Sequence, residues 1–147
     1  MEEEKKIPDN FNGENKRLHL QMIEGIINRM GNNSFLIKGW SLTSIGGLIT
    51  LFIANHEKQW AYYLLFVALG ACLVFWRNDA TFLYYERQHR KLYNEVCKLT
   101  EDKINFSMQL LENNESIWTC CGRPVYLWSY GVVTIVLIVM LYIFKPC

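Results

Sequence analysis

Three histidines are the residues of this 147-residue chain whose chemistry would best suit catalysis or metal binding. His19, His56 and His89 lie far apart, and none has a second histidine at a metal-ligand spacing such as H-x-x-x-H. His89 stands beside Arg90, a pairing that occurs in metal-independent ribonucleases, but the arginine-to-histidine spacing of those enzymes is absent. Phosphate-binding and nucleophile motifs such as G-x-x-x-x-G-K-[ST] and G-x-S-x-G are also absent. We therefore expect no enzyme activity, no catalytic or metal-binding residue and no cofactor.

The elements that position these residues are dominated by three long runs without charge. No Asp, Glu, Lys or Arg occurs in Gly39–Ala54, Trp60–Trp76 or Val125–Phe144, which contain 16, 17 and 20 residues. A bilayer core of about 30 Å needs roughly 20 helical residues, and a soluble helix rarely extends that far without a charge. The sequence therefore predicts three transmembrane helices. A soluble bundle with an unusually apolar core is the alternative.

The ends of the two shorter runs support this prediction. The first run reaches 20 residues if it begins at Phe35, because Lys38 can extend its ammonium toward the lipid headgroups while its methylenes stay in lipid. Trp60 and Trp76 bound the second run, as aromatic residues do at a membrane interface. We expect residues 55–58 to form a polar turn between the first two spans.

Positive charge predicts the orientation of the spans. Lys58 and Lys145 fall on one side of the membrane, and the other thirteen Lys and Arg residues fall on the opposite side. Cytosolic segments carry the excess of positive charge, so we expect a cytosolic N-terminus and an external C-terminus. The first span would act as the insertion signal, because residues 1–15 contain no apolar signal-peptide core.

An amphipathic helix is expected before the first span. Its apolar residues recur at spacings of three and four, which predicts a single apolar face. These residues are Leu20, Ile23, Ile27 and Met30, with Ile26 beside them. We expect the helix to begin within residues 12–15 and to end at Gly31, and we expect Ser34 to cap the first transmembrane helix.

A heptad pattern follows the second run and is typical of a coiled-coil seam. The seam residues are Phe82, Tyr85, His89, Leu92, Val96 and Leu99, and the count continues to Lys103, Phe106 and Leu110. Asp79 and Thr81 are candidate helix-start residues, but no Gly or Pro follows Trp76, so the second span can continue as one helix. Two interpretations remain open. The seam joins copies of the chain, or it packs on residues 14–30 of the same chain.

The first span carries a face of small residues. Spacings of four, three and four place them on one side of the helix: Thr43, Gly47, Thr50 and Ala54. Small residues let helices approach closely in lipid. In one interpretation this face packs or lines a polar path between copies. In the other it packs against Gly70 and Ala71 of the same hairpin.

The five cysteines form no C-x-x-C pair and predict no disulfide framework. Cys120 and Cys121 lie just before the third span, where palmitoylation and unmodified reduced thiols are alternatives.

The predicted fold class is an all-α integral membrane protein with three transmembrane helices. Residues 1–34 hold the cytosolic amphipathic helix, and residues 35–76 form the transmembrane hairpin. Residues 77–123 contain the long cytosolic helix with its heptad seam and a linker. Residues 124–147 contain the third transmembrane helix and a short external tail.

The order of these segments resembles small bacterial membrane proteins encoded beside anti-phage systems. The sequences HLQMIEGIINRMGNNSFLIKGW and FWRNDATFLYYERQHRKLYNEV carry the resemblance, which covers residues 15–100. The chain is similar to SLATT-type effectors, which have two spans and a helix, and to the accessory membrane proteins of RADAR and RNA-targeting CRISPR loci. The third span departs from the two-span pattern, and no functional residues are carried over.

This resemblance implies an oligomeric effector or accessory subunit of an anti-phage system in the bacterial inner membrane. Such a protein perturbs or permeabilises the membrane during infection. The implied partners are membrane lipid, further copies of the chain and a soluble defence protein encoded nearby, without direct nucleic-acid binding. The alternative is a passive anchor that recruits a soluble defence enzyme or another complex. A small transporter or respiratory subunit is disfavoured, because the three runs contain no carboxylate or histidine for proton coupling.

Overall fold

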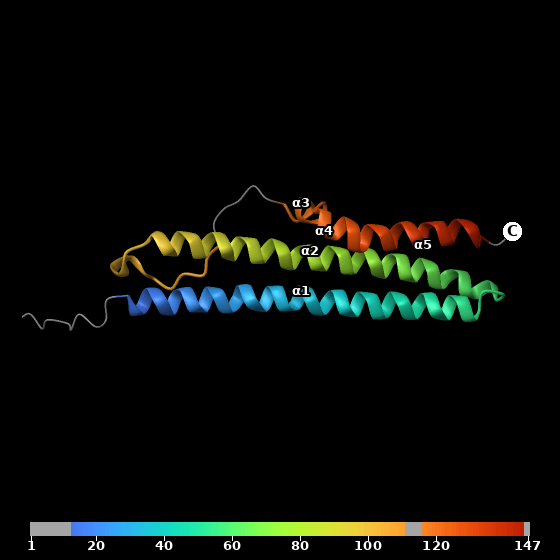
Figure 1. Cartoon of the computed structure of the whole chain (residues 1–147), viewed down its shortest axis with the longest axis horizontal. Coiled ribbons are helices and arrows are strands. Elements are labelled where there is room, and N and C mark those ends of the chain that lie inside the picture. Colours follow the sequence, from blue (N-terminus) through green and yellow to red (C-terminus); the bar gives the residue numbers. More distant parts are fainter. Residues whose placement is uncertain (1–12, 111–115, 146–147) are drawn as a thin grey trace, which may run out of the picture.

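The computed structural model describes residues 13–110 and 116–145, and it is built around a long antiparallel helical hairpin. Helix α1 (Glu14–Ala54) and helix α2 (Tyr62–Lys98) lie side by side (Figure 1). The predicted turn is confirmed, because Asn55 ends α1 and the Lys58 amide donates to the Asn55 carbonyl at 2.8 Å. A short 3₁₀ turn, η2 (Gln59–Ala61), leads into α2.

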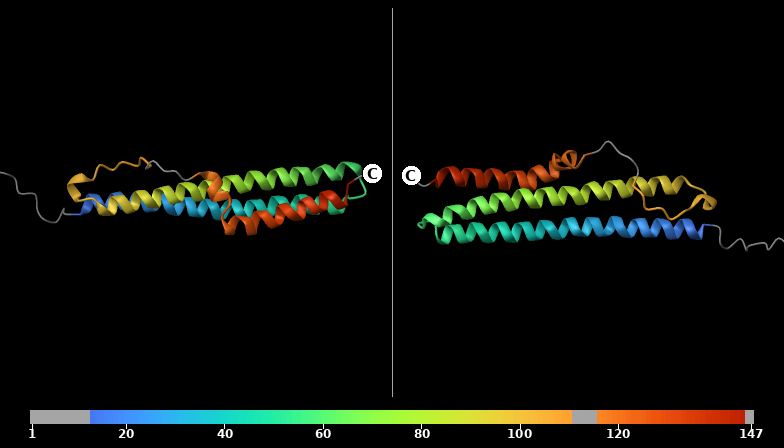
Figure 2. Two further views of the ribbon diagram at one scale, coloured as in Figure 1. Left: turned by 90° about the horizontal axis from the view of Figure 1, so that it is seen from above. Right: turned by 180° about the vertical axis from the view of Figure 1, so that it is seen from behind.

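The third helical segment lies along the half of the hairpin that ends at this turn (Figure 2). It begins with the short helices α3 (Ile117–Cys121) and α4 (Pro124–Tyr126). It continues as a π-helix, η4 (Leu127–Gly131), and then as α5 (Val132–Ile143). Pro124 is well suited to the start of α4. Backbone N–H groups in the first turn of a helix have no partner within the helix, so the N–H that proline lacks is not needed there. We refer to α4, η4 and α5 together as the third span.

Three helical segments are long and apolar enough to cross a membrane: Glu14–Ala54, Gln59–Lys98 and Pro124–Ile143. In the most apolar stretch of each, only 17%, 22% and 17% of the residues are buried inside the protein. Large side chains such as Leu42, Phe66 and Ile135 are exposed instead. So much exposed apolar surface favours lipid as the surrounding solvent and argues against a soluble bundle.

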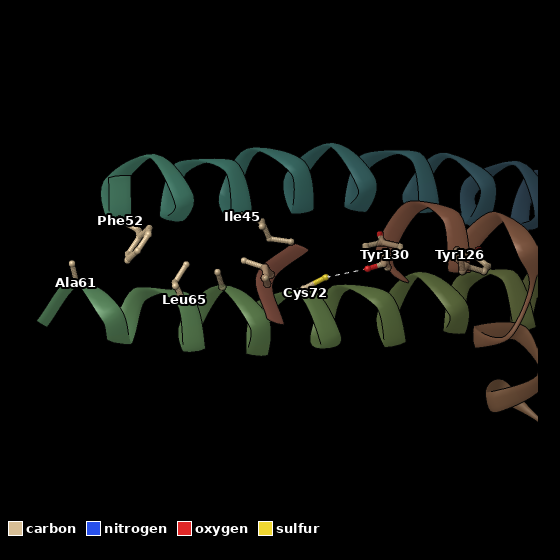
Figure 3. Close-up of a cluster of buried hydrophobic side chains, with 9 residues drawn as sticks. Ile45, Phe52, Ala61, Leu65, Cys72, Tyr126 and Tyr130 are labelled. Atoms are coloured by element: carbon tan, nitrogen blue, oxygen red, sulfur yellow. Dashed lines mark hydrogen bonds between the residues drawn. The ribbon is translucent and has the colours of Figure 1, made fainter. Parts of the chain in front are cut away.

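An apolar core joins the three spans (Figure 3). Its buried residues come from all of them: Ile45 and Phe52 of α1, Ala61, Leu65, Ala68 and Cys72 at η2 and α2, and Tyr126, Tyr130 and Leu137 of the third span. Polar contacts beside this core also join the third span to α2. The Tyr62 hydroxyl donates to the Leu141 carbonyl at 3.1 Å, and the Cys72 thiol lies 3.9 Å from the Tyr130 carbonyl.

The predicted break in the first helix is wrong. Helix α1 is continuous through Gly31, and a Cβ added there would meet nothing within 4 Å. Glycine in a helix interior costs about 1 kcal/mol relative to alanine, and the packing of α1 along α2 offsets this cost. Ser34 therefore caps no helix, and the predicted boundary at residue 34 is not a boundary of secondary structure.

Helix α2 continues without interruption past Trp76, as predicted, but it ends at Lys98. The extension of the heptad pattern to Lys103, Phe106 and Leu110 is therefore wrong. Residues 99–110, which we call the return segment, contain only the short 3₁₀ turn η3 (Glu101–Lys103). The return segment folds back, so that Ile104 and Met108 pack on a second core of Ile23, Ile27, Leu92 and Val96.

Polar contacts fix the ends of α1 and α2 to each other. The Glu101 carboxylate accepts hydrogen bonds from the Asn15 and Lys16 amides at 2.8 and 3.2 Å. The Lys16 ammonium donates to the Cys97 and Leu99 carbonyls at 2.8 and 2.9 Å. A carboxylate thus lies at the amino end of α1 and an ammonium at the carboxyl end of α2, where the free backbone groups of each helix favour that charge.

Candidate functional site

A buried carboxylate lies where the three spans meet. The Asp79 side chain is 0% exposed, and its Oδ2 lies 2.6 Å from the Lys38 ammonium. Its Oδ1 accepts a hydrogen bond from the Ser34 hydroxyl, which also accepts one from Lys38 at 2.7 Å. The Tyr130 hydroxyl donates to Oδ2 at 3.1 Å. We call these four residues the polar hub. Two of them come from α1, one from α2 and one from the third span.

The hub holds the third span by two aromatic residues one turn apart. Tyr130 lies in the π-helix η4, a form that is frequent at functional sites. The Tyr126 hydroxyl donates to the Asp79 backbone carbonyl at 3.4 Å, and the Lys38 ammonium lies 5.1 Å from the centre of the Tyr126 ring. Cation and ring therefore attract each other as well. Both tyrosines thus bind the third span to one residue of α2 and its partner on α1.

The hub is stable because each charge has its partners. A carboxylate without partners in an apolar interior would be very costly, but Asp79 accepts from Ser34, Lys38 and Tyr130. Removing one member of such a buried pair costs about 3–5 kcal/mol, because the other charge is left uncompensated. The hub can therefore hold three helices in one arrangement.

The geometry of the hub adds to the sequence prediction for Lys38. Its ammonium binds Asp79, a partner that the sequence analysis did not assign, and its side chain remains 35% exposed. Asp79 is not a helix-start residue, because α2 passes through it. The sequence held a usable signal: Lys38 precedes Lys58 in the turn by 20 residues, and Asp79 follows it by 21. In an antiparallel hairpin such residues lie opposite each other.

Only some residues of the heptad seam are buried in the structure. Leu92 and Val96 are buried against Ile23 and Ile27 of α1, as the interpretation of packing within one chain predicted. The exposed fraction of Tyr85 is 41%, while Phe82, His89 and Leu99 are half-buried. A coiled coil between copies that used Leu92 and Val96 would have to replace their contacts with α1.

The small-residue face lies on the outside of the hairpin. Thr43, Gly47, Thr50 and Ala54 are all exposed, and a Cβ added at Gly47 or Gly70 would meet nothing within 4 Å. The interpretation in which this face packs on Gly70 and Ala71 is therefore wrong. The Thr43 and Thr50 hydroxyls donate to the Gly39 and Gly46 carbonyls at 3.0 and 2.9 Å, so their polar groups are satisfied within α1. The face is open to lipid or to a second copy.

The cysteine pair lies beside the hub at the start of the third segment. Cys120 is buried and Cys121 is half-buried, and the Trp76 indole donates to the Cys121 carbonyl at 3.2 Å. Burial raises the pKa of the Cys121 thiol, and the neighbouring Cys120 raises it further. Acylation of Cys120 would require this residue to leave its packed position.

The described residues contain no group of three or more His, Cys, Asp or Glu side chains that could hold a metal ion. Comparisons with protein-family models, curated proteins and solved structures give no match. The functional proposal therefore rests on the polar hub, the exposed small-residue face and the order of the segments.

Proposed function

We propose that the chain is an oligomeric inner-membrane effector or accessory subunit of a bacterial anti-phage system, which perturbs or permeabilises the membrane when its polar hub opens. The observation that supports this most directly is the fully buried Asp79, which binds Lys38 of α1 and Tyr130 of the third span. Ionisable residues next to lipid are expensive, and they commonly mark the parts of membrane proteins that act.

In the proposed resting state the hub fixes the third span against the hairpin. Apolar contacts alone discriminate poorly between positions of a helix in lipid, because the lipid chains offer equivalent contacts. The hydrogen bonds from Tyr126 and Tyr130 to Asp79 are specific to one position. A trigger that disrupts the hub would free the third span, and the rearranged spans would then disturb the bilayer.

Assembly is proposed to use the small-residue face of α1. Thr43, Gly47, Thr50 and Ala54 are exposed, so a second α1 can approach them closely. This differs from assembly through Leu92 and Val96, whose side chains already pack inside the chain.

Gly47→Leu should reduce the number of subunits per nanodisc, and Gly70→Leu, at an exposed glycine of α2, is the matched control. A monomer both alone and with its neighbouring gene products would refute a self-assembled channel.

The membrane activity is tested by following a membrane-potential dye in cells that express the chain with its neighbouring genes. Tyr130→Phe removes one hydrogen bond from the hub, so we expect depolarisation at a lower level of trigger. Tyr142→Phe is the control, because Tyr142 is 84% exposed. An unchanged potential during triggered toxicity would contradict the proposed permeabilisation.

A passive anchor remains the second candidate, and a polar cavity between α1 and α2 favours it. This cavity of about 350 Å³ is lined by Glu24, Ile27 and Asn28 of α1 and by Arg90, Tyr93 and Asn94 of α2. It offers a soluble partner several hydrogen-bonding groups. Thr50→Asp distinguishes the candidates: an inserted anchor keeps its partner, while a membrane-active oligomer loses activity or changes conductance.

A further inference from the structure

A groove lies between α1 and the third span. It has a volume of about 310 Å³. Leu42, Ile45, Gly46 and Ile49 form its wall on α1, and Val133 faces them from α5. Lys38 lies at one end of this wall, together with the Ser41 and Ser129 side chains. The groove is therefore polar at one end and apolar along the rest of its length.

The α1 wall of the groove is about as long as one leaflet of a bilayer is thick. Lys38 and Ile49 are eleven residues apart on α1. A helix rises 1.5 Å per residue, so the wall between them is about 16 Å long. The hydrocarbon core of a bilayer is about 30 Å thick, and half of it is about 15 Å. A chain that starts at Lys38 and follows the groove would thus end near the bilayer midplane.

The polar end can bind a phosphate. A lysine ammonium has three donors, and Asp79 and Ser34 accept two of those of Lys38. Apart from the Tyr126 ring, whose centre lies 5.1 Å away, the ammonium has no third acceptor among the residues that the structure describes, and the side chain is 35% exposed. A headgroup phosphate is a strong acceptor of such a charge-assisted hydrogen bond.

The size of the groove distinguishes between occupants. A helix with its side chains is about 10 Å across, so a 16 Å length of it fills more than about 1000 Å³. A helix of a second copy therefore cannot be enclosed in a cavity of about 310 Å³. An extended acyl chain is thin enough.

We propose that this groove binds one phospholipid from the leaflet on the Lys38 side, as a lipid site of the resting protein. Its phosphate contacts the Lys38 ammonium, and one acyl chain lies along Leu42, Ile45 and Ile49 opposite Val133. The site connects the polar hub to the lipid phase, because Lys38 and Tyr130 belong to both. The proposal does not depend on whether the protein disturbs the membrane.

Two adjacent glycines provide a matched pair of variants. Gly46 lines the groove and Gly47 does not, and a Cβ added at either would meet nothing within 4 Å. Gly46→Leu should therefore fold and fill the groove, while Gly47→Leu should fold and leave the groove open. The full chain is reconstituted in nanodiscs with a phospholipid that carries a photoactivatable diazirine in its acyl chain. Mass spectrometry then locates the crosslinked residues.

We expect crosslinks to concentrate at Ile45, Ile49 and Val133, to fall several-fold in Gly46→Leu and to persist in Gly47→Leu. Uniform labelling around α1, or groove labelling that Gly46→Leu leaves unchanged, would show annular lipid only and overturn the proposal. Crosslinks from these residues to a second copy would also overturn it.

A diacylglycerol with the same diazirine tests whether the headgroup phosphate contributes to binding. Weaker groove labelling by this lipid supports the Lys38 contact, and equal labelling refutes it.

Discussion

At the scale of single residues, Asp79 determines the position of the third span. Its side chain is fully buried, and it receives hydrogen bonds or an ion pair from Ser34, Lys38 and Tyr130. In lipid, burial of apolar side chains supplies little preference for one helix position over another. A charged group with few acceptable partners supplies that preference. We therefore regard the hub as the residue-scale determinant of how the three spans are arranged.

A double-mutant cycle tests this role. Asp79→Asn leaves the Lys38 charge without its counterion, so we expect a loss of about 3 kcal/mol in the free energy of unfolding in detergent. Lys38→Met should also destabilise, because Asp79 then keeps an uncompensated charge. In the double variant both charges are gone, and we expect much of the stability to return. A coupling energy between the two substitutions below about 0.5 kcal/mol would contradict the ion pair.

We expect alkylation of the Cys121 thiol to require a higher pH than alkylation of an ordinary cysteine. The pKa of this thiol is raised, and burial is the largest cause of the shift. Only the thiolate reacts with alkylating reagents, so a raised pKa keeps the reactive fraction low at neutral pH and lets it increase as pH rises through that pKa. Alkylation rates of variants that retain only Cys121 or only the exposed Cys97 are followed by mass spectrometry against pH. A Cys121 rate that levels off below about pH 8 would contradict the shift.

The contacts between the ends of α1 and α2 act at the scale of elements. Glu101 accepts hydrogen bonds from two amides in the first turn of α1, and Lys16 of that turn donates to two carbonyls at the end of α2. Lys16 of α1 thus satisfies backbone groups at the end of α2, and Glu101 of the return segment satisfies backbone groups at the start of α1. The return segment is fixed by the same contacts, because Glu101 belongs to it.

We expect Glu101→Gln to loosen this end locally. A carboxylate at a helix amino terminus contributes about 1 kcal/mol, so the first turn of α1 should exchange its amide hydrogens about fivefold faster. Hydrogen exchange with mass spectrometry measures this effect in the turn and in the return segment. Asp102→Asn is the control, because Asp102 is exposed in the same 3₁₀ turn. Equal exchange in both variants would show that Glu101 caps nothing.

The elements also show how much the sequence could predict. Runs without charge predicted the spans and the turn at residues 55–58, because both features depend on local composition. The break at Gly31 was wrong, since the packing of a long hairpin overrides a local helix-breaking signal. The partner of Lys38 depends on the register of α1 against α2 and on Tyr130 from a distant segment. The periodicity of one segment contains no information about contacts between segments that are distant in the sequence.

At the scale of the whole molecule, the hub lies toward the polar end of the hairpin. Asp79 follows Trp76, the last residue of the uncharged run, by three residues, and Lys38 directly precedes the first run. The carboxyl end of α2 and the return segment lie at the end of the hairpin opposite the turn (Figure 1). In the proposed function a soluble trigger reaches the hub from that side, so the orientation of the chain decides from which compartment the trigger acts.

We predict that this side is the cytosol, because thirteen of the fifteen Lys and Arg residues fall on it. Variants that retain a single cysteine test the orientation. Cys97 is exposed near the end of α2, and Cys147 is the last residue, outside the described part of the structure. A membrane-impermeant maleimide should label Cys147 alone in intact spheroplasts and Cys97 alone in inverted vesicles. The reverse pattern would place the hub near the external face, and a cytosolic trigger could then act on it only through the spans themselves.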